Sequence, residues 1–137
     1  MPDSRPPTLF SLAEGAMSAQ LVRMNAATSN LANAGSISGT EEGAYRPIRA
    51  VFQTALDEAS GIATVTSTQL VRGNSNPTER YDPGNVLANE DGNVFEAPVD
   101  ESAEMLEIME SARQYQNMVQ ALQTARQLML DTLRSNS

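Results

Sequence analysis

Pairs of adjacent carboxylates are the residues in this sequence with the most obvious capacity for chemistry. Hydrolysis of a glycosidic bond needs two carboxyl groups held across a cleft, one of them with a raised pKa. Adjacent acids in polar, turn-rich stretches are instead normally solvated, so we expect no catalytic role for these pairs and no enzymatic activity. The pairs are Glu41 with Glu42, Asp57 with Glu58, and Glu90 with Asp91.

A metal site is the second chemistry to consider. The segment "NEDGN", residues 89 to 93, resembles part of a calcium loop, but it lacks the alternating acids and the distal glutamate that such a loop needs. We therefore expect a hairpin turn there. The seven methionines are suited to filling irregular gaps between helices. We expect no metal and no cofactor.

The composition excludes further classes of chemistry. The chain has 137 residues, enough for one domain, and a net charge of -8, with no Cys and no His. Thiolate chemistry and histidine-based catalysis are therefore absent. All nine basic residues are arginine, which removes Schiff-base lysine chemistry. An acidic chain without a basic stripe is a poor ligand for phosphates, so we expect no nucleic acid partner.

Membrane insertion and a cleaved signal are not expected either. No apolar run approaches the roughly 20 residues that a membrane span needs. The opening "MPDSRPPTLFSL" lacks a positive region followed by a hydrophobic block. The expectation is a cytosolic protein, or one exported by a machine that reads no such signal.

The elements that must carry any function are two long helices. Residues 9–35 show apolar positions at alternating steps of three and four, the seam of a coiled coil, with the start marked by Thr8 or Ser11. Residues 1–8 are expected to be a flexible tail. The first seam is Phe10, Ala13, Met17, Gln20, Met24, Ala27, Leu31 and Ala34.

Residues 99–137 repeat this scheme. Its one polar position, Arg126, can lay its stem along the seam, or the stripe drifts to Ala125. Acids in the first turns complement the helix dipole and add solubility. The second seam is Met105, Ile108, Ala112, Tyr115, Val119, Leu122, Arg126, Met129 and Leu133.

The middle region, residues 36–98, changes to a β-like pattern. "YRPIRAVFQ" alternates, with Pro47 limiting it to an edge strand or the start of one. Ile62 to Val71 is rich in β-branched residues. Val86-Leu87 and Val94-Phe95 could form brief strands. The predicted fold is mainly α, with the two helices packed as a coiled-coil-like antiparallel pair and a small β-rich insert, α+β overall.

The first helix carries only two charges, Glu14 and Arg23, and the second carries none from Gln114 to Ala125. A buried unpaired charge is costly, whereas an amide can find partners, so both helices are typical of elements contacted on more than one side. A simple two-helix hairpin with a neutral solvent face is the alternative. In "TSNLANAGS", Gly35 suits a helix end with positive φ. Asn30 and Asn33 either only end the helix or also bind a neighbour's backbone.

Four segments carry a resemblance to a known family. "AMSAQLVRMNAATSNLANAGS" and "YRPIRAVFQ" resemble the flagellar basal-body rod proteins. "YDPGNVLANEDGNVFEAP" and "EMLEIMESARQYQNMVQALQTARQLMLDTL" are more specific to one proximal component of the rod. The resemblance covers the chain from about Leu9 to Leu133.

This resemblance implies a mechanical role without enzymatic activity. Family members stack helically, with copies of themselves and with other rod proteins, into the drive shaft that crosses the periplasm and surrounds the export channel. They leave the cell through the flagellar type III export apparatus. The implied subunit-interface residues are Phe10, Ala13, Met17, Met24, Ala27, Asn30, Leu31, Asn33, Met105, Ile108, Ala112, Tyr115, Val119, Leu122 and Met129.

A different class of function remains open as an alternative. The same helices would suit a stand-alone binding module, such as an export chaperone or a secreted adaptor, that folds by itself and binds one client. The two functions differ in whether the helices are ordered before assembly.

Overall fold

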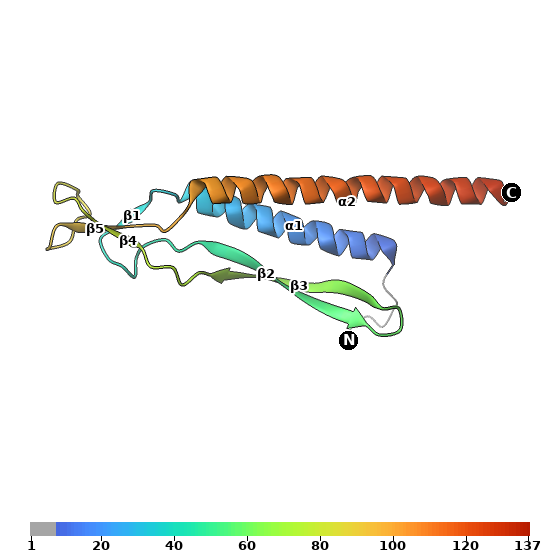
Figure 1. Ribbon diagram of the computed structural model, residues 1–137, viewed down its shortest axis with the longest axis horizontal. Helices are drawn as coiled ribbons and strands as arrows, with labels where there is room; N and C mark the ends of the chain where they lie inside the picture. Colours follow the sequence, from blue (N-terminus) through green and yellow to red (C-terminus); the bar gives the residue numbers. More distant parts are fainter. Residues whose placement is uncertain (1–7) are drawn as a thin grey trace.

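The computed structural model describes residues 8–137, so most of the predicted tail, residues 1–7, lies outside the described residues. The molecule is elongated, with two long helices along its length and a small β region (Figure 1). The fold is therefore α+β, as predicted. The elements are α1 (Leu9–Ala32), β1 (Ile37–Ser38), β2 (Ile48–Asp57), β3 (Ile62–Arg72), β4 (Thr78–Tyr81), β5 (Asn93–Glu96) and α2 (Glu101–Ser135).

Helix α1 begins and ends with local hydrogen bonds that its sequence supplies. Thr8 is the N-cap: its hydroxyl accepts from the Ser11 amide at 3.1 Å, and the Ser11 hydroxyl accepts from the Thr8 amide at 2.9 Å. At the other end, the Asn33 side chain donates to the Ser29 carbonyl at 2.9 Å. Gly35 then turns the chain with a φ of 78°. The helix begins at Leu9 and ends at Ala32, three residues before the end of the predicted segment 9–35.

Helix α2 has 35 residues, against 24 for α1. Asp100 caps its start by accepting from the Ala103 amide at 3.2 Å. The two helices lie side by side and run in opposite directions, and the C-terminal part of α2 extends past the start of α1 (Figure 1).

Strands β2 and β3 form a long antiparallel hairpin against α1. The predicted strand from Ile62 to Val71 is confirmed as β3, and Pro47 directly precedes β2. The hairpin and α2 lie on opposite sides of α1 (Figure 1), so α1 has neighbours on two faces.

The remaining strands form a small antiparallel sheet in the order β1-β5-β4 at the end where α1 finishes (Figure 1). The brief strand expected at Val94-Phe95 is confirmed as part of β5. The one suggested at Val86-Leu87 is wrong, because two consecutive turns hold that segment: the Asn85 amide donates to the Asp82 carbonyl and the Ala88 amide to the Asn85 carbonyl, each at 3.0 Å.

The buried interior is small for a chain of this size. The chain exposes 9556 Å², whereas a compact 14.7 kDa monomer would expose about 6,900 Å². Among the described residues, the fully buried apolar side chains are mostly alanines, and three of the buried residues are polar. The buried apolar side chains include Ala19, Ala26, Ala27, Ala44, Val94 and Ala97, and the buried polar ones are Asn30, Glu104 and Ser111.

Candidate subunit interface

The Asn30 side chain forms four hydrogen bonds within the chain. It is completely buried, and its Nδ2 donates to the Ile48 carbonyl at 2.9 Å and to Glu104 Oε2 at 3.2 Å. Its Oδ1 accepts from the Ile48 amide at 2.8 Å and from the Tyr45 hydroxyl at 2.7 Å. These four bonds use its donors and acceptors inside the chain. Asn30 was predicted to contact another subunit, whereas all four of these partners belong to its own chain. The interface role of Asn30 and of the half-buried Asn33 stays a prediction.

Glu104 places a carboxylate in the same buried position. Its exposed fraction is only 1%, and it accepts from Arg49 Nη1 at 3.0 Å and also pairs with Arg49 Nη2. The hydrogen bond to Glu104 raises the pKa of Arg49, against the opposing effect of burial. Glu104 is one of the first-turn acids that were expected to complement the helix dipole and add solubility. The structure instead makes it the charge partner of strand β2.

A second ionic contact, formed by Arg23, joins α1 to α2. Its Nη2 donates to Glu107 Oε2 at 3.0 Å, its Nε pairs with Glu107 Oε1, and Nη2 lies 3.4 Å from Glu110 Oε2. The hydrogen bond from Arg23 lowers the pKa of the Glu107 carboxyl below its ordinary value, although burial acts in the opposite direction. The pKa of Arg23 is raised in turn.

Together these residues form what we call the polar junction: Arg23, Asn30, Arg49, Glu104 and Glu107. It connects the C-terminal half of α1 with the first turns of α2 and the start of β2. Since each contact joins a fixed position on one element to a fixed position on another, the junction sets how far the two helices are offset. The junction could not be predicted from the sequence, because the residues that contact one another in it lie far apart along the chain.

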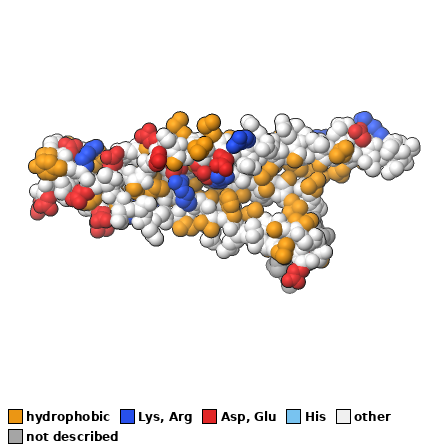
Figure 2. All heavy atoms as spheres, in the orientation of Figure 1, with side chains coloured by type: hydrophobic (Ala, Val, Ile, Leu, Met, Phe, Trp, Pro, Cys, Tyr) orange, Lys and Arg blue, Asp and Glu red, His pale blue; other side chains and the backbone are white. Residues whose placement is uncertain are grey.

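The opposite end of the helix pair is open and apolar. Two grooves lie between α1 and α2 there, lined by predicted seam residues that include Phe10, Met17, Tyr115 and Leu122. Figure 2 shows the same division on one face: charged side chains gather toward the left and middle, and hydrophobic ones continue over the right-hand part. The helices are therefore fixed by polar contacts at one end and only half covered at the other.

The structure places the predicted interface residues at three levels of burial. Ala27 and Asn30 are completely buried within the chain. Phe10, Met105 and Met129 are exposed. The half-buried ones are Ala13, Met17, Met24, Leu31, Asn33, Ile108, Ala112, Tyr115, Val119 and Leu122. No neighbouring subunit is present to test these assignments, so their role in an interface stays a prediction.

The covered face of α2 is broader than the predicted seam. The seam positions Ile108, Ala112, Tyr115, Val119 and Leu122 are half-buried, and the most buried positions, Glu104 and Ser111, lie beside the seam. Near the end of the groove Ala125 is half-buried while Arg126 is exposed, so the drift to Ala125 considered above is what the structure shows. The other half-buried positions are Glu107, Glu110 and Met118.

Large apolar side chains remain uncovered on the rest of α2. Near its start Leu106 is 63% and Met109 is 68% exposed, and in the part that extends past α1 Leu133 is 67% exposed. Large apolar side chains exposed at both ends of one helix are typical of an element that other molecules contact. Leu106 and Met109 were not among the predicted interface residues, although their apolar side chains next to the seam could have identified them.

The residues first considered for chemistry do not converge. Glu41 and Glu42 lie in a loop, Asp57 and Glu58 at the β2–β3 turn, and Glu90 and Asp91 in the turn before β5. Within residues 8–137 there is no group of three or more His, Cys, Asp or Glu placed to hold a metal ion. Neither helix in the described part of the chain is long and apolar enough to cross a membrane.

An elongated chain with a small interior and uncovered apolar side chains along its helices is typical of a structural subunit. Comparison with known proteins identifies the family. Residues 10–35 match the family model described as "Flagella basal body rod protein".

Curated relatives extend this match over nearly the whole chain. The flagellar basal-body rod protein FlgC of Salmonella typhimurium is 39% identical over 127 residues, covering 91% of this chain and 93% of its own length. FlgC of Yersinia enterocolitica is 36% identical over 125 residues, and FlgC of Agrobacterium fabrum is 31% identical over 124 residues, or 89% of this chain and 88% of its own. The chain belongs to the FlgC family of flagellar basal-body rod proteins, a structural and not an enzymatic family.

Proposed function

We propose that this chain is a subunit of the proximal rod, which assembles helically with copies of itself and with other rod proteins. The assembled rod is the drive shaft that transmits torque from motor to hook across the periplasm and encloses the export channel. Family membership supports the place of the chain in the basal body. The half-covered helix pair supports the mode of assembly.

The single observation that carries this proposal is the open end of the α1–α2 pair. Seam residues such as Phe10 and Leu122 line grooves there instead of a closed core, and α2 continues beyond α1 with its apolar side chains uncovered. A helix with apolar side chains on several faces is stable only where other helices cover it. In the rod, helices of neighbouring subunits would supply that cover, and the pair would close as an antiparallel coiled-coil-like unit.

Torque transmission follows from the sum of many such contacts. Burial of a Leu- or Met-sized side chain contributes about 1.5 to 3 kcal/mol. Several such side chains on each subunit, repeated around the shaft, would hold it together without covalent bonds. The chain has no cysteine, so cross-links by disulfides are not available.

Passage through the flagellar type III export apparatus, without a cleaved signal peptide, is part of the proposal. The small interior supports it, because a chain with few fully buried side chains loses little free energy when it unfolds for transport. The same property favours a rod subunit over a stand-alone chaperone or adaptor, which would need its helices ordered before it binds a client.

The test is to delete the endogenous copy in the bacterium that carries this chain and to supply an epitope-tagged version. We expect restored swimming, and we expect the tagged chain to remain with purified basal bodies after detergent extraction. Recovery of the chain only in the soluble fraction, bound to a single client, would favour the chaperone or adaptor function instead.

A further inference from the structure

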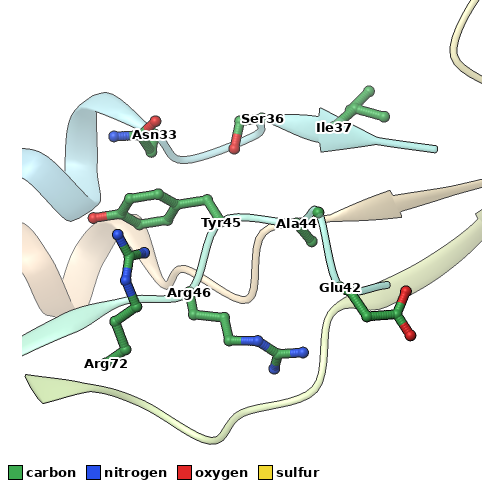
Figure 3. Close-up of a pocket in the computed structure, with 9 residues that line it drawn as sticks. Asn33, Ser36, Ile37, Glu42, Ala44, Tyr45, Arg46 and Arg72 are labelled. Atoms are coloured by element: carbon green, nitrogen blue, oxygen red, sulfur yellow. The ribbon is translucent and has the colours of Figure 1, made fainter. Parts of the chain in front are cut away.

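A pocket separate from the helix seam lies where the end of α1, the loop before β2 and the end of β3 meet (Figure 3). Its volume is about 560 Å³. The pocket is next to the polar junction, since Tyr45 lines it and donates its hydroxyl hydrogen to Asn30. We call it the arginine pocket, and its principal lining residues are Asn33, Ser36, Tyr45, Arg46 and Arg72.

Two cations of this pocket are not neutralised by the described residues. Arg46 donates from one nitrogen to the Ser75 carbonyl at 2.7 Å, which leaves most of its five N–H groups available. Within residues 8–137, no carboxylate forms an ion pair with Arg46 or Arg72. The pocket also contains one carboxylate, Glu42, but in Figure 3 its side chain points away from Tyr45 and Arg72.

A buried hydroxyl provides an independent observation. Ser36 Oγ is buried, and no hydrogen-bond partner satisfies it. In Figure 3 this oxygen points from the chain after α1 toward the space above Tyr45. A buried polar atom without a partner is destabilising, and a ligand oxygen that reaches it would supply the missing bond.

We propose that the arginine pocket receives a carboxylate side chain from an adjoining subunit of the rod. In Figure 3 the Arg72 guanidinium lies beside Tyr45, whereas the Arg46 guanidinium points toward the side of Glu42. The two oxygens of a carboxylate can accept from the Arg72 guanidinium and from the Ser36 hydroxyl, and Arg46 adds positive charge to the pocket. The chain has 17 acidic residues against nine arginines, so a pocket with an excess of cations is complementary to the surface that copies of this chain present. This inference rests on the proposed rod function, because it requires a neighbour.

The first test is removal of both positive charges. The double variant Arg46→Gln with Arg72→Gln is expected to keep its helical circular dichroism and its export, while the number of complete rods per cell falls at least tenfold. The matched control is Arg113→Gln, which removes an exposed arginine of α2 outside the pocket. The double variant Arg46→Lys with Arg72→Lys keeps both positive charges, and we expect it to assemble rods normally. Normal rods in the double Gln variant would overturn the inference.

The second test identifies the occupant even if the double Gln variant assembles poorly for another reason. A photo-reactive benzoylphenylalanine at position 42, an exposed site on the pocket wall, is activated in purified basal bodies. We expect a cross-linked peptide from a neighbouring subunit with Asp or Glu at or next to the cross-linked residue. Mass spectrometry of that peptide tells a second copy of this chain from another rod protein.

The outcomes separate this inference from the proposed function. If the chain is present in basal bodies but cross-links only to peptides without a carboxylate, or to none, the pocket has no acidic occupant and the rod function stands. If the chain is absent from basal bodies altogether, both proposals fail.

Discussion

The side chain of Asn30 binds both backbone polar groups of Ile48, donating to its carbonyl at 2.9 Å and accepting from its amide at 2.8 Å. An amide side chain on a helix thus takes the place of a neighbouring strand at the start of β2. This pair of bonds fixes the point at which the β2–β3 hairpin leaves the helices. The hairpin is otherwise largely exposed along its length.

Replacement of Asn30 should therefore release the start of the hairpin. In Asn30→Ala, the amide and carbonyl of Ile48 lose their partner, at a cost of about 1 to 3 kcal/mol for a buried group left unsatisfied. We expect hydrogen exchange at the Ile48 amide to become much faster. The control is Asn25→Ala, an exposed asparagine of α1. Unchanged protection of Ile48 in Asn30→Ala would show that the pair does not hold the hairpin.

Arg49 should stabilise the fold mainly because its guanidinium neutralises the buried carboxylate of Glu104. Arg49→Ala leaves a buried carboxylate without its charge partner, and we expect a loss of about 2 kcal/mol in the free energy of unfolding, less than for a fully enclosed pair because the Arg49 side chain is 52% exposed. Adding Glu104→Gln should recover part of this loss. The measurement is a double-mutant cycle by urea unfolding. Additive effects of the two changes would contradict the coupling.

The outline of this fold could be predicted from sequence because it depends on local pattern. The 3-4 apolar spacing gave both helices, the β-branched run gave β3, and Thr8 and Gly35 marked the ends of α1. Each of these signals lies within a few residues of the structure it determines. The strand suggested at Val86-Leu87 was wrong because two apolar residues in a row do not reveal that the backbone of this segment forms two consecutive turns.

The polar junction could not be predicted in the same way. Arg23 and Glu107 are 84 positions apart, and Arg49 and Glu104 are 55 apart. The acids at the start of α2 look alike in the sequence, and only the packing of three elements makes Glu104 buried while Glu101 stays exposed. The burial of Glu104 and Ser111 beside the α2 seam could not be predicted for the same reason, since it depends on how α2 packs against the other elements.

Acidification should weaken the contact between the helices through Glu107. Its pKa is lowered from the ordinary value of 4.5, so its stabilising contribution is fully present above about pH 4.5 and is lost as the pH falls through the lower folded-state pKa. We expect Glu107→Gln to be less stable than wild type at pH 7, with the difference shrinking toward pH 3. Urea unfolding at both pH values measures this. The control is Glu90→Gln, a change of the same kind in a turn away from the helices.

The apolar end of α2 offers a test of assembly that leaves the polar junction intact. Leu133 is 67% exposed and lies beyond the reach of α1, so Leu133→Asp should not alter the fold of the single chain. If neighbours bury this side chain, about 2 kcal/mol per subunit is lost, equal to roughly a 30-fold weaker contact. We expect fewer complete rods and reduced swimming. Ser135→Asp adds the same charge two residues later, and equal defects in both variants would point to charge instead of lost burial.

The isolated chain should be ordered unevenly along its helices. Near the polar junction, contacts among α1, α2 and β2 hold both helices, whereas the last turns of α2 are exposed, and a short helical segment without packing partners is marginal in water. We therefore expect amide exchange in the purified monomer to be slow around Glu104 to Ser111 and fast beyond Leu122, with a helical signal that melts gradually. Assembly would extend slow exchange to the end of α2. A sharp cooperative melt of the monomer, with Leu128 to Leu133 already protected, would mean that the helices are complete without neighbours, which is the state that a stand-alone binding module requires.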